Sequence, residues 1–141
     1  IEYAIPRVHK FLVAEGIRDK VTLIASGGVR TPHDLVKAIA LGADGVVIGT
    51  AEMIALGCLR CAICESGRGC PRGIATTDPQ LMQQMELQWA TQRLINLMSA
   101  WREELVRVLV RLGMSSVREL VGRTDCLYLM SDEPAATEVR P

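Results

Sequence analysis

Apolar residues recur at helical spacing over residues 2–15, and Gly16 marks the end of that predicted helix. Two short apolar runs, 21–25 and 45–48, do not alternate with polar residues, which is typical of buried strands. Residues 31–41 lie between these runs and have the pattern of a second helix. The predicted order is therefore helix, strand, helix, strand, joined by short connections.

The second helix carries a clear start signal. Thr31 can cap it, Pro32 suits its first position, and Asp34 favours the positive end of the helix dipole. Gly42 follows and predicts its end.

Short apolar strands that alternate with helices indicate an α/β fold whose parallel sheet is covered on both faces. An open doubly wound sheet and a closed (β/α)8 barrel both meet this description, and both need more than two strands. The chain also starts within a pattern, without an initiating Met. We therefore expect a fragment of a larger domain.

Beyond residue 50 the pattern changes to helices and an irregular loop. Residues 51–59 fit one or two helical turns, residues 67–73 are rich in Gly, and Asp78 with Pro79 starts a new helix. Up to its predicted end at Gly113, that helix has apolar residues at gaps of three and four: Leu94, Met98, Trp101, Leu105, Val108 and Leu112. Ser116 begins a capping box for a last short helix.

Composition narrows the classes of function. The 141 residues include 16 Lys+Arg and 16 Asp+Glu without a basic run, which argues against nucleic acid as a partner. The longest run without a charged residue, 21–29, is far shorter than the roughly 20 residues of a membrane-spanning helix. Since the chain also shows no signal-peptide pattern, we expect a cytoplasmic protein that binds neither nucleic acid nor membrane.

A glycine turn follows each predicted strand. Ser26-Gly27-Gly28 comes after the first strand, and Gly49-Thr50 comes after the second. Glycine lets backbone N–H groups approach a phosphate closely, and the loops after the last two strands of (β/α)8 barrels commonly form a phosphate site. Ordinary strand-to-helix turns use the same residues, so spacing alone leaves both interpretations open.

Four of the five cysteines, Cys58, Cys61, Cys64 and Cys70, lie within thirteen residues. Their spacing resembles that of the ferredoxin motif C-x2-C-x2-C-x3-C-P. Thiolates are soft ligands that suit an iron–sulfur cluster. Structural zinc, disulfides and inert thiols are the alternatives, although zinc usually takes two close pairs from separate segments. Cys126 stands apart and is expected to be a buried thiol.

These features resemble one known family. Residues 24–31, Ile-Ala-Ser-Gly-Gly-Val-Arg-Thr, and residues 43–51, Ala-Asp-Gly-Val-Val-Ile-Gly-Thr-Ala, look like the end of the flavin-binding barrel of glutamate synthase. Residues 55–76 resemble the cysteine loop of that family, and residues 122–125 resemble its C-terminal helical region. The resemblance covers nearly the whole chain except the tail.

The resemblance implies the C-terminal part of a (β/α)8 TIM barrel, followed by an iron–sulfur loop and C-terminal helices. Residues 1–57 would supply the last two βα units of an FMN-binding barrel, 58–77 the cysteine loop, 78–124 the helical region and 125–141 a mostly disordered tail. The positions that match those holding the FMN phosphate are Ser26, Gly27, Gly28, Gly49 and Thr50. The expected cluster ligands are Cys58, Cys61, Cys64 and Cys70.

The family's reaction sets the expected activity. In it, 2-oxoglutarate and ammonia form 2-iminoglutarate, and reduced FMN delivers a hydride to give L-glutamate. Ammonia comes from glutamine in a separate amidotransferase domain, and the cluster relays electrons from an NADPH-linked partner subunit or from ferredoxin. Because the residues that hold 2-oxoglutarate lie mostly on earlier strands, no catalytic residue is assigned, and we expect this fragment to be inactive alone.

The cysteine spacing departs from the family's common form, in which three Cys at gaps of five and four residues hold a [3Fe–4S] cluster. Here five residues separate Cys64 from Cys70, and Cys61 is additional. A fourth thiolate makes [4Fe–4S] the alternative cluster and suggests the archaeal-type or short branch, whose members need not all make glutamate. The alternative functions are an IMP dehydrogenase-like barrel, which uses one nucleophilic Cys, and a non-enzymatic four-cysteine module for electron transfer or zinc binding.

Overall fold

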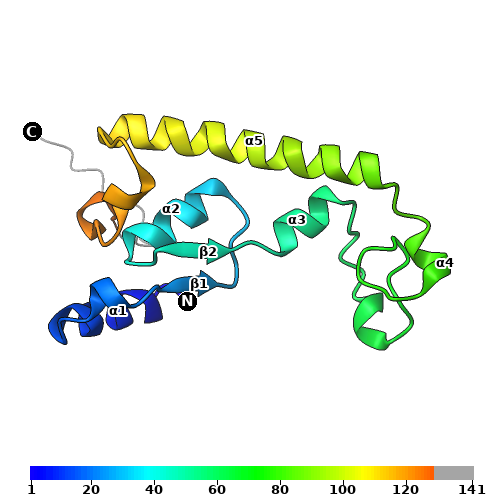
Figure 1. The fold of residues 1–141 in the computed structure, drawn as a ribbon, viewed down its shortest axis with the longest axis horizontal. Helices are drawn as coiled ribbons and strands as arrows, with labels where there is room; N and C mark the ends of the chain where they lie inside the picture. Colours follow the sequence, from blue (N-terminus) through cyan, green and yellow to red (C-terminus); the bar gives the residue numbers. More distant parts are fainter. Residues whose placement is uncertain (129–141) are drawn as a thin grey trace, which may run out of the picture.

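The computed structural model describes residues 1–128, which form an α/β segment followed by helices (Figure 1). The α/β segment has the order that the apolar pattern predicts. Its elements are α1 (Ala4–Ala14), the 3-10 turn η1 (Arg18–Lys20), β1 (Ile24–Ser26), α2 (Pro32–Ala40) and β2 (Gly45–Val47).

The strands β1 and β2 pair in parallel, with Ile24 opposite Gly45. The first strand is shorter than the predicted 21–25, because strand pairing starts only where β2 begins. Before that point, the Asp44 amide donates to the Leu23 carbonyl at 2.7 Å, and the Leu23 amide donates to the Asp44 carboxylate at 2.7 Å. The extended residues before Ile24 therefore bond to the loop that precedes β2 and are not part of a strand.

The helices cover one face of this two-stranded sheet. The core on that face consists of small and medium apolar side chains: Ile5, Ala25, Ala38, Ala43 and Val46. On the opposite face, Ile24 and Val47 are 52% and 50% exposed. One face of the sheet is thus uncovered by any residue in 1–128.

The predicted start of α2 is confirmed and is a complete capping box. The Asp34 amide donates to the Thr31 hydroxyl at 3.3 Å, and the Asp34 carboxylate accepts the Thr31 amide at 2.9 Å. Partial burial acts to raise the pKa of Asp34. Hydrogen bonds from the Thr31 hydroxyl and from the Arg30 and Thr31 amides outweigh it, so this pKa lies below its ordinary value.

The rest of the described chain is helical around the cysteine loop. Its elements are α3 (Thr50–Ala55), the turn η2 (Ile63–Ser66) within the loop, α4 (Pro79–Met82) and α5 (Leu87–Leu112). The prediction of one continuous helix from Asp78 was wrong, because the chain leaves helical geometry between α4 and α5. The backbone of Leu81 lies against Gly73 of the cysteine loop, so the chain turns around that loop before α5 begins.

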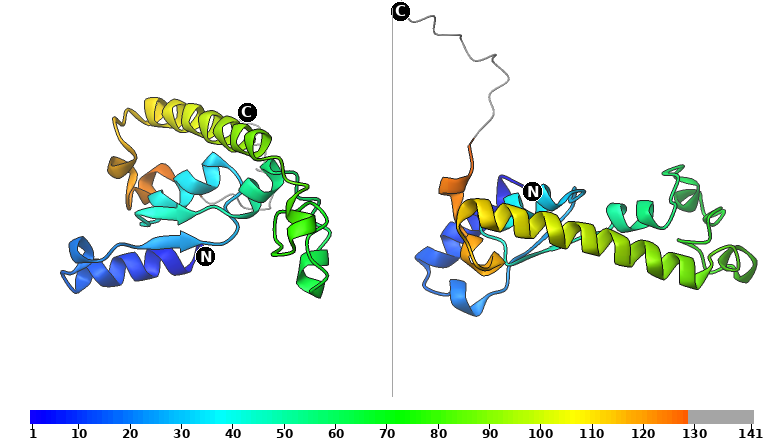
Figure 2. Two further views of the ribbon diagram at one scale, coloured as in Figure 1. Left: turned by 45° about the vertical axis from the view of Figure 1, so that its right-hand side comes forward. Right: turned by 90° about the horizontal axis from the view of Figure 1, so that it is seen from above.

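The long helix α5 lies across α2 and α3 and reaches from the cysteine loop to the C-terminal turns (Figures 1 and 2). Of the predicted apolar stripe, Trp101 is buried, and Leu94, Leu105 and Val108 are half-buried. Met98 and Leu112 are 39% and 37% exposed, because the contact face centres on Ala90 and Trp101. Gly113 ends the helix as predicted, with φ +68°.

The last described turns pack back onto α2. The predicted final α-helix is the 3-10 turn η3 (Val117–Leu120), and its Ser116 hydroxyl contacts the Glu119 carboxylate at 3.1 Å instead of capping a backbone N–H. Leu120 is 1% exposed and joins Ile39 and Ala40 in a second core cluster.

The predicted tail, 125–141, is only partly described. The turn η4 (Thr124–Cys126) leads into it, and half-buried Cys126 and Leu127 pack against the second core cluster. Cys126 is therefore less buried than expected. Residues 129–141 lie outside the described part, and so does most of the predicted disorder.

Candidate functional site

The two glycine turns lie side by side at the carboxyl ends of β1 and β2. Because the two strands are parallel and in register, the chain leaves both at the same edge of the sheet. All five residues expected to bind a phosphate line one hollow of about 210 Å³: Ser26, Gly27, Gly28, Gly49 and Thr50. We call this hollow, with those five residues, the glycine cradle.

The space beside the glycines of the glycine cradle is open. Gly27 and Gly28 have φ values of +112° and +75°, which L side chains rarely adopt. A Cβ built on Gly27, Gly28 or Gly49 would meet no atom within 4 Å, so each would project into open space. A phosphate can therefore approach the backbone N–H groups here, and the residues present fit the phosphate end of FMN.

The cysteine loop follows α3 and lies at the far end of the molecule from α1 (Figure 1). Cys61 and Cys64 are exposed, Cys58 is half-buried and Cys70 is buried. Within residues 1–128, no group of three or more His, Cys, Asp or Glu side chains is placed to hold one metal ion. The four predicted ligands are thus on one loop without converging. Thiolates repel one another until a metal neutralises them, so metal binding and the ordering of such loops are coupled.

Cys70 nevertheless has the surroundings of a thiolate. Backbone N–H groups of Ala75 and Arg72, and also of Ile74 and Gly73, donate to its sulfur. Together they outweigh the effect of burial and lower the pKa of this thiol below its usual range. Four cysteine thiols with backbone N–H groups nearby are the kinds of group that fit an iron–sulfur cluster, whose sulfurs accept backbone hydrogen bonds.

Comparison with known proteins identifies the family of the chain. The family model described as a conserved region in glutamate synthase matches residues 1–115. The chain belongs to the glutamate synthase family.

Relatives within the glutamate synthase family differ in length. The chain is 45% identical over 127 residues to an archaeal glutamate synthase [NADPH] of Methanocaldococcus jannaschii, covering 90% of this chain and 25% of that protein. It is 42% identical to the archaeal-type glutamate synthase [NADPH] of Thermotoga neapolitana, with the same coverage. It is 36% identical to the glutamate synthase [NADPH] large chain of Azospirillum brasilense, covering 92% of this chain and 8% of that one. The chain thus spans about a quarter of the archaeal-type relatives.

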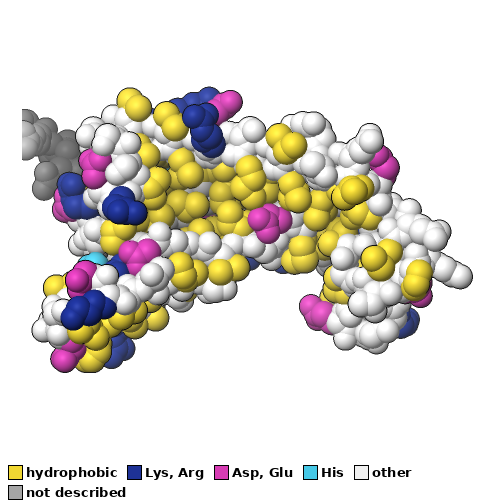
Figure 3. All heavy atoms as spheres, viewed as in Figure 1, with side chains coloured by type: hydrophobic (Ala, Val, Ile, Leu, Met, Phe, Trp, Pro, Cys, Tyr) yellow, Lys and Arg dark blue, Asp and Glu magenta, His cyan; other side chains and the backbone are white. Residues whose placement is uncertain are grey.

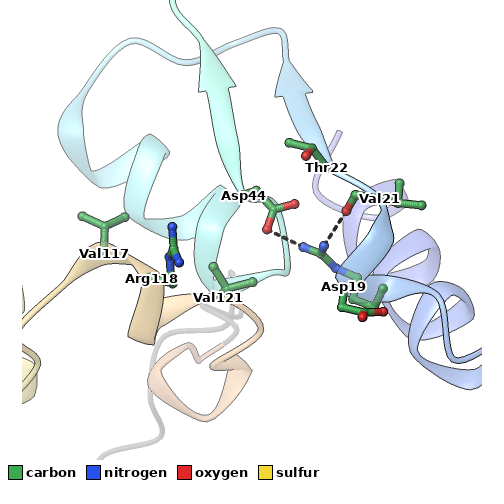
Figure 4. Close-up of a pocket in the computed structure, with 8 residues that line it drawn as sticks. Asp19, Val21, Thr22, Asp44, Val117, Arg118 and Val121 are labelled. Atoms are coloured by element: carbon green, nitrogen blue, oxygen red, sulfur yellow. Dashed lines mark hydrogen bonds and ion pairs between the residues drawn. The ribbon is translucent and has the colours of Figure 1, made fainter.

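A larger cavity of the chain, about 870 Å³, lies at the opposite ends of the strands (Figure 4). Val21 and Thr22 before β1, and Asp44 before β2, line it together with η3. Arg18 donates to the Val21 carbonyl at 2.8 Å and to the Asp44 carboxylate at 2.8 Å. In parallel α/β folds the amino ends of strands serve stability rather than catalysis, so the smaller glycine cradle is the better candidate site.

Two features of the site were missed from the sequence. The N–H groups around Cys70 belong to ordinary residues, and their only signal is Gly73 shortly after Cys70-Pro71. Arg30 lines the glycine cradle and lies two residues after Gly28.

No helix among residues 1–128 is both long and apolar enough to cross a membrane.

Proposed function

We propose that this chain is part of an FMN- and iron–sulfur-dependent oxidoreductase that makes L-glutamate from 2-oxoglutarate, with ammonia from glutamine. The observation that carries the proposal is the direct succession, along the chain, of a bare glycine cradle and a four-cysteine loop. Membership of the glutamate synthase family supports the reaction class and favours it over an IMP dehydrogenase-like barrel or a four-cysteine module without enzymatic activity.

We infer a (β/α)8 barrel from the uncovered face of the sheet. Ile24 and Val47 share that face and are half-exposed, whereas the other face packs on α1 and α2. Both outer edges of the two-stranded sheet are also unpaired within residues 1–128. In a closed barrel, further strands would pair with both edges, and the uncovered face would become the packed interior.

When bound, FMN supplies the hydride that reduces 2-iminoglutarate, which forms from 2-oxoglutarate and ammonia with loss of water, and an iron–sulfur cluster supplies the electrons for the flavin. The glycine cradle would bind the phosphate through its backbone N–H groups and the hydroxyls of Ser26 and Thr50. Arg30 at its edge adds positive charge. This arrangement anchors one end of the cofactor on rigid strand ends.

The cysteine loop would hold the cluster through Cys58, Cys61, Cys64 and Cys70. Its N–H groups lower the pKa of the Cys70 thiol, which favours the thiolate form that binds metal. Four thiolates favour a [4Fe–4S] cluster, and a [3Fe–4S] cluster would leave Cys61 unused. The names of relatives support NADPH or ferredoxin as the source of electrons. We propose an NADPH-linked partner subunit or ferredoxin as the donor, and the cytoplasm as the location.

Two glycines with nearly equal backbone angles give a matched test. Gly28 and Gly16 have φ values of +75° and +67°, and a Cβ at either meets no atom within 4 Å. An alanine at either position therefore has a similar backbone cost, about 1–2 kcal/mol. Of the two, only Gly28 lines the glycine cradle.

We expect Gly28→Ala in the full-length protein to weaken FMN binding at least about tenfold, a change of about 1.4 kcal/mol. Gly16→Ala should keep the wild-type flavin content. Flavin fluorescence on titration measures both, and glutamate formation from 2-oxoglutarate, glutamine and a reduced donor measures activity. Equal FMN affinity in the two variants, or no glutamate from the wild type, would contradict the proposal.

A further inference from the structure

A second hollow, of about 450 Å³, lies beside the glycine cradle between α3, α5 and the start of the cysteine loop. Three arginines from separate segments line it: Arg30 after β1, Arg60 in the cysteine loop and Arg93 on α5. The remaining wall is mostly apolar, with Thr50 and Asn96 as its uncharged polar residues. Among the described residues, no Asp or Glu lines this arginine pocket.

Some arginines among residues 1–128 are paired with a carboxylate, and others are not. Arg18, Arg107 and Arg123 each form an ion pair with a carboxylate. Within residues 1–128, the side chains of Arg30, Arg60 and Arg93 form none. Three guanidinium groups around one hollow repel one another, and this repulsion is relieved when an anion binds between them.

Arg93 is held in place for such a role. Its Nε donates to the Ala55 carbonyl at 3.0 Å, and its guanidinium lies 5.6 Å from the centre of the Trp89 ring. Its two Nη atoms make no hydrogen bond within the described chain. A guanidinium that is already fixed loses less conformational entropy when it binds an oxyanion.

We propose that the arginine pocket binds a small organic phosphate monoester. Guanidinium groups match the geometry of phosphate oxygens and bind them with charge-assisted hydrogen bonds. The apolar wall favours an organic group attached to the phosphate, and the volume lies in the range of small-molecule sites. This site is distinct from the glycine cradle, although Arg30 and Thr50 border both, and it does not depend on the FMN proposal.

The ligand would join three segments of the site. Arg60 belongs to the cysteine loop, where its own backbone is left-handed with φ +53°, and Arg93 belongs to α5. A phosphate bound by both side chains links the cysteine loop to α5 beside the glycine cradle. Occupancy of the pocket therefore stabilises the cysteine loop next to the flavin turns.

The test is a calorimetric titration of the full-length protein with phenyl phosphate at low salt, with and without saturating FMN. Phenol, which has the same ring without the phosphate, is the uncharged probe. Arg60→Gln removes one charge from an exposed side chain without a described contact, and Asn96→Asp places a carboxylate in the wall. Arg102→Gln is the control, because it removes an exposed charge from α5 outside the pocket.

We expect phenyl phosphate to bind with or without FMN and phenol not to bind. Arg60→Gln and Asn96→Asp should each weaken the affinity about tenfold, as loss of a charge-assisted hydrogen bond does, and Arg102→Gln should leave it unchanged. The proposal is overturned if the wild type does not bind phenyl phosphate, or if FMN abolishes binding. It is also overturned if all three variants bind equally. A protein that takes up no FMN still reports on the pocket, so the two proposals fail separately.

Discussion

Asp44 and Arg18 form an ion pair at 2.8 Å at the amino ends of the two strands. The side chains are 31% and 15% exposed, so this ion pair is better shielded from water than a typical surface pair. Partial burial acts to raise the pKa of Asp44. Hydrogen bonds from Arg18 and from the Leu23 amide, with the charge of Arg18, outweigh it, so the pKa lies below its ordinary value of 3.8.

Asp44→Asn tests this pair. Since the pKa of Asp44 is lower in the folded state, the stabilisation is fully present above the unfolded pKa and is lost as the pH falls through the folded pKa. At pH 7 we expect the variant to lose about 1–2 kcal/mol, measured as a lower apparent Tm of the full-length protein. The difference from wild type should narrow below about pH 4. An equal difference at both pH values would argue against a charged Asp44 as the cause.

At the residue scale, the sequence indicates which residues could bind a metal or a phosphate. It does not indicate which groups surround them in the fold. The soft donors from Cys58 to Cys70 and the turns after each strand could be identified, because their residue types are rare and specific. The N–H groups that surround Cys70 could not, since every residue has a backbone amide and only the folded loop aims several at one sulfur. The arginine pocket was missed for a similar reason, because α5 brings Arg93 beside Arg60 across a long stretch of chain.

At the element scale, the cysteine loop and α4 support one another. The Asp78 carboxylate accepts the Gln80 amide at 2.8 Å and so caps α4, as predicted. Gly73 packs so tightly on this short helix that a Cβ there would meet the Leu81 carbonyl oxygen. Gly67 lies in the same loop with a similar φ, +74° against +70°, and has no atom within 4 Å of that position.

Replacing each of these glycines by alanine separates backbone strain from packing. Gly67→Ala should cost about 1–2 kcal/mol through strain alone. Gly73→Ala adds a clash with backbone, so we expect it to detach α4 and expose the loop to protease. Limited proteolysis of the full-length protein should show at least about tenfold faster cleavage near residues 73–86 in Gly73→Ala, which corresponds to about 1.4 kcal/mol of local stability. Similar cleavage rates in both variants would contradict the packing role.

Local signals also explain which element boundaries could be predicted. The caps at Thr31 and Asp78 and the stop at Gly113 depend on neighbouring residues, so the sequence shows them directly. The break between α4 and α5 depends on the contact of Leu81 with Gly73 across the loop. Such a contact between segments has no local pattern.

At the scale of the whole molecule, residues 1–128 leave apolar surfaces exposed. Apolar side chains spread over the face between α5 and the strands (Figure 3). The sheet has one uncovered face, and the chain spans about a quarter of its archaeal-type relatives. The α/β class could be predicted because two βα units repeat its pattern. The closed barrel is a proposal, because residues 1–128 contain only two strands.

The central claim is that the cysteine loop holds an iron–sulfur cluster beside a flavin site. It is tested most directly by counting iron, zinc and acid-labile sulfide in the full-length protein, purified without oxygen, together with Cys70→Ser and the control Cys126→Ser. We expect iron with matching sulfide in the wild type and in Cys126→Ser, and loss of both in Cys70→Ser. Zinc without sulfide, or iron that survives Cys70→Ser unchanged, would contradict the account.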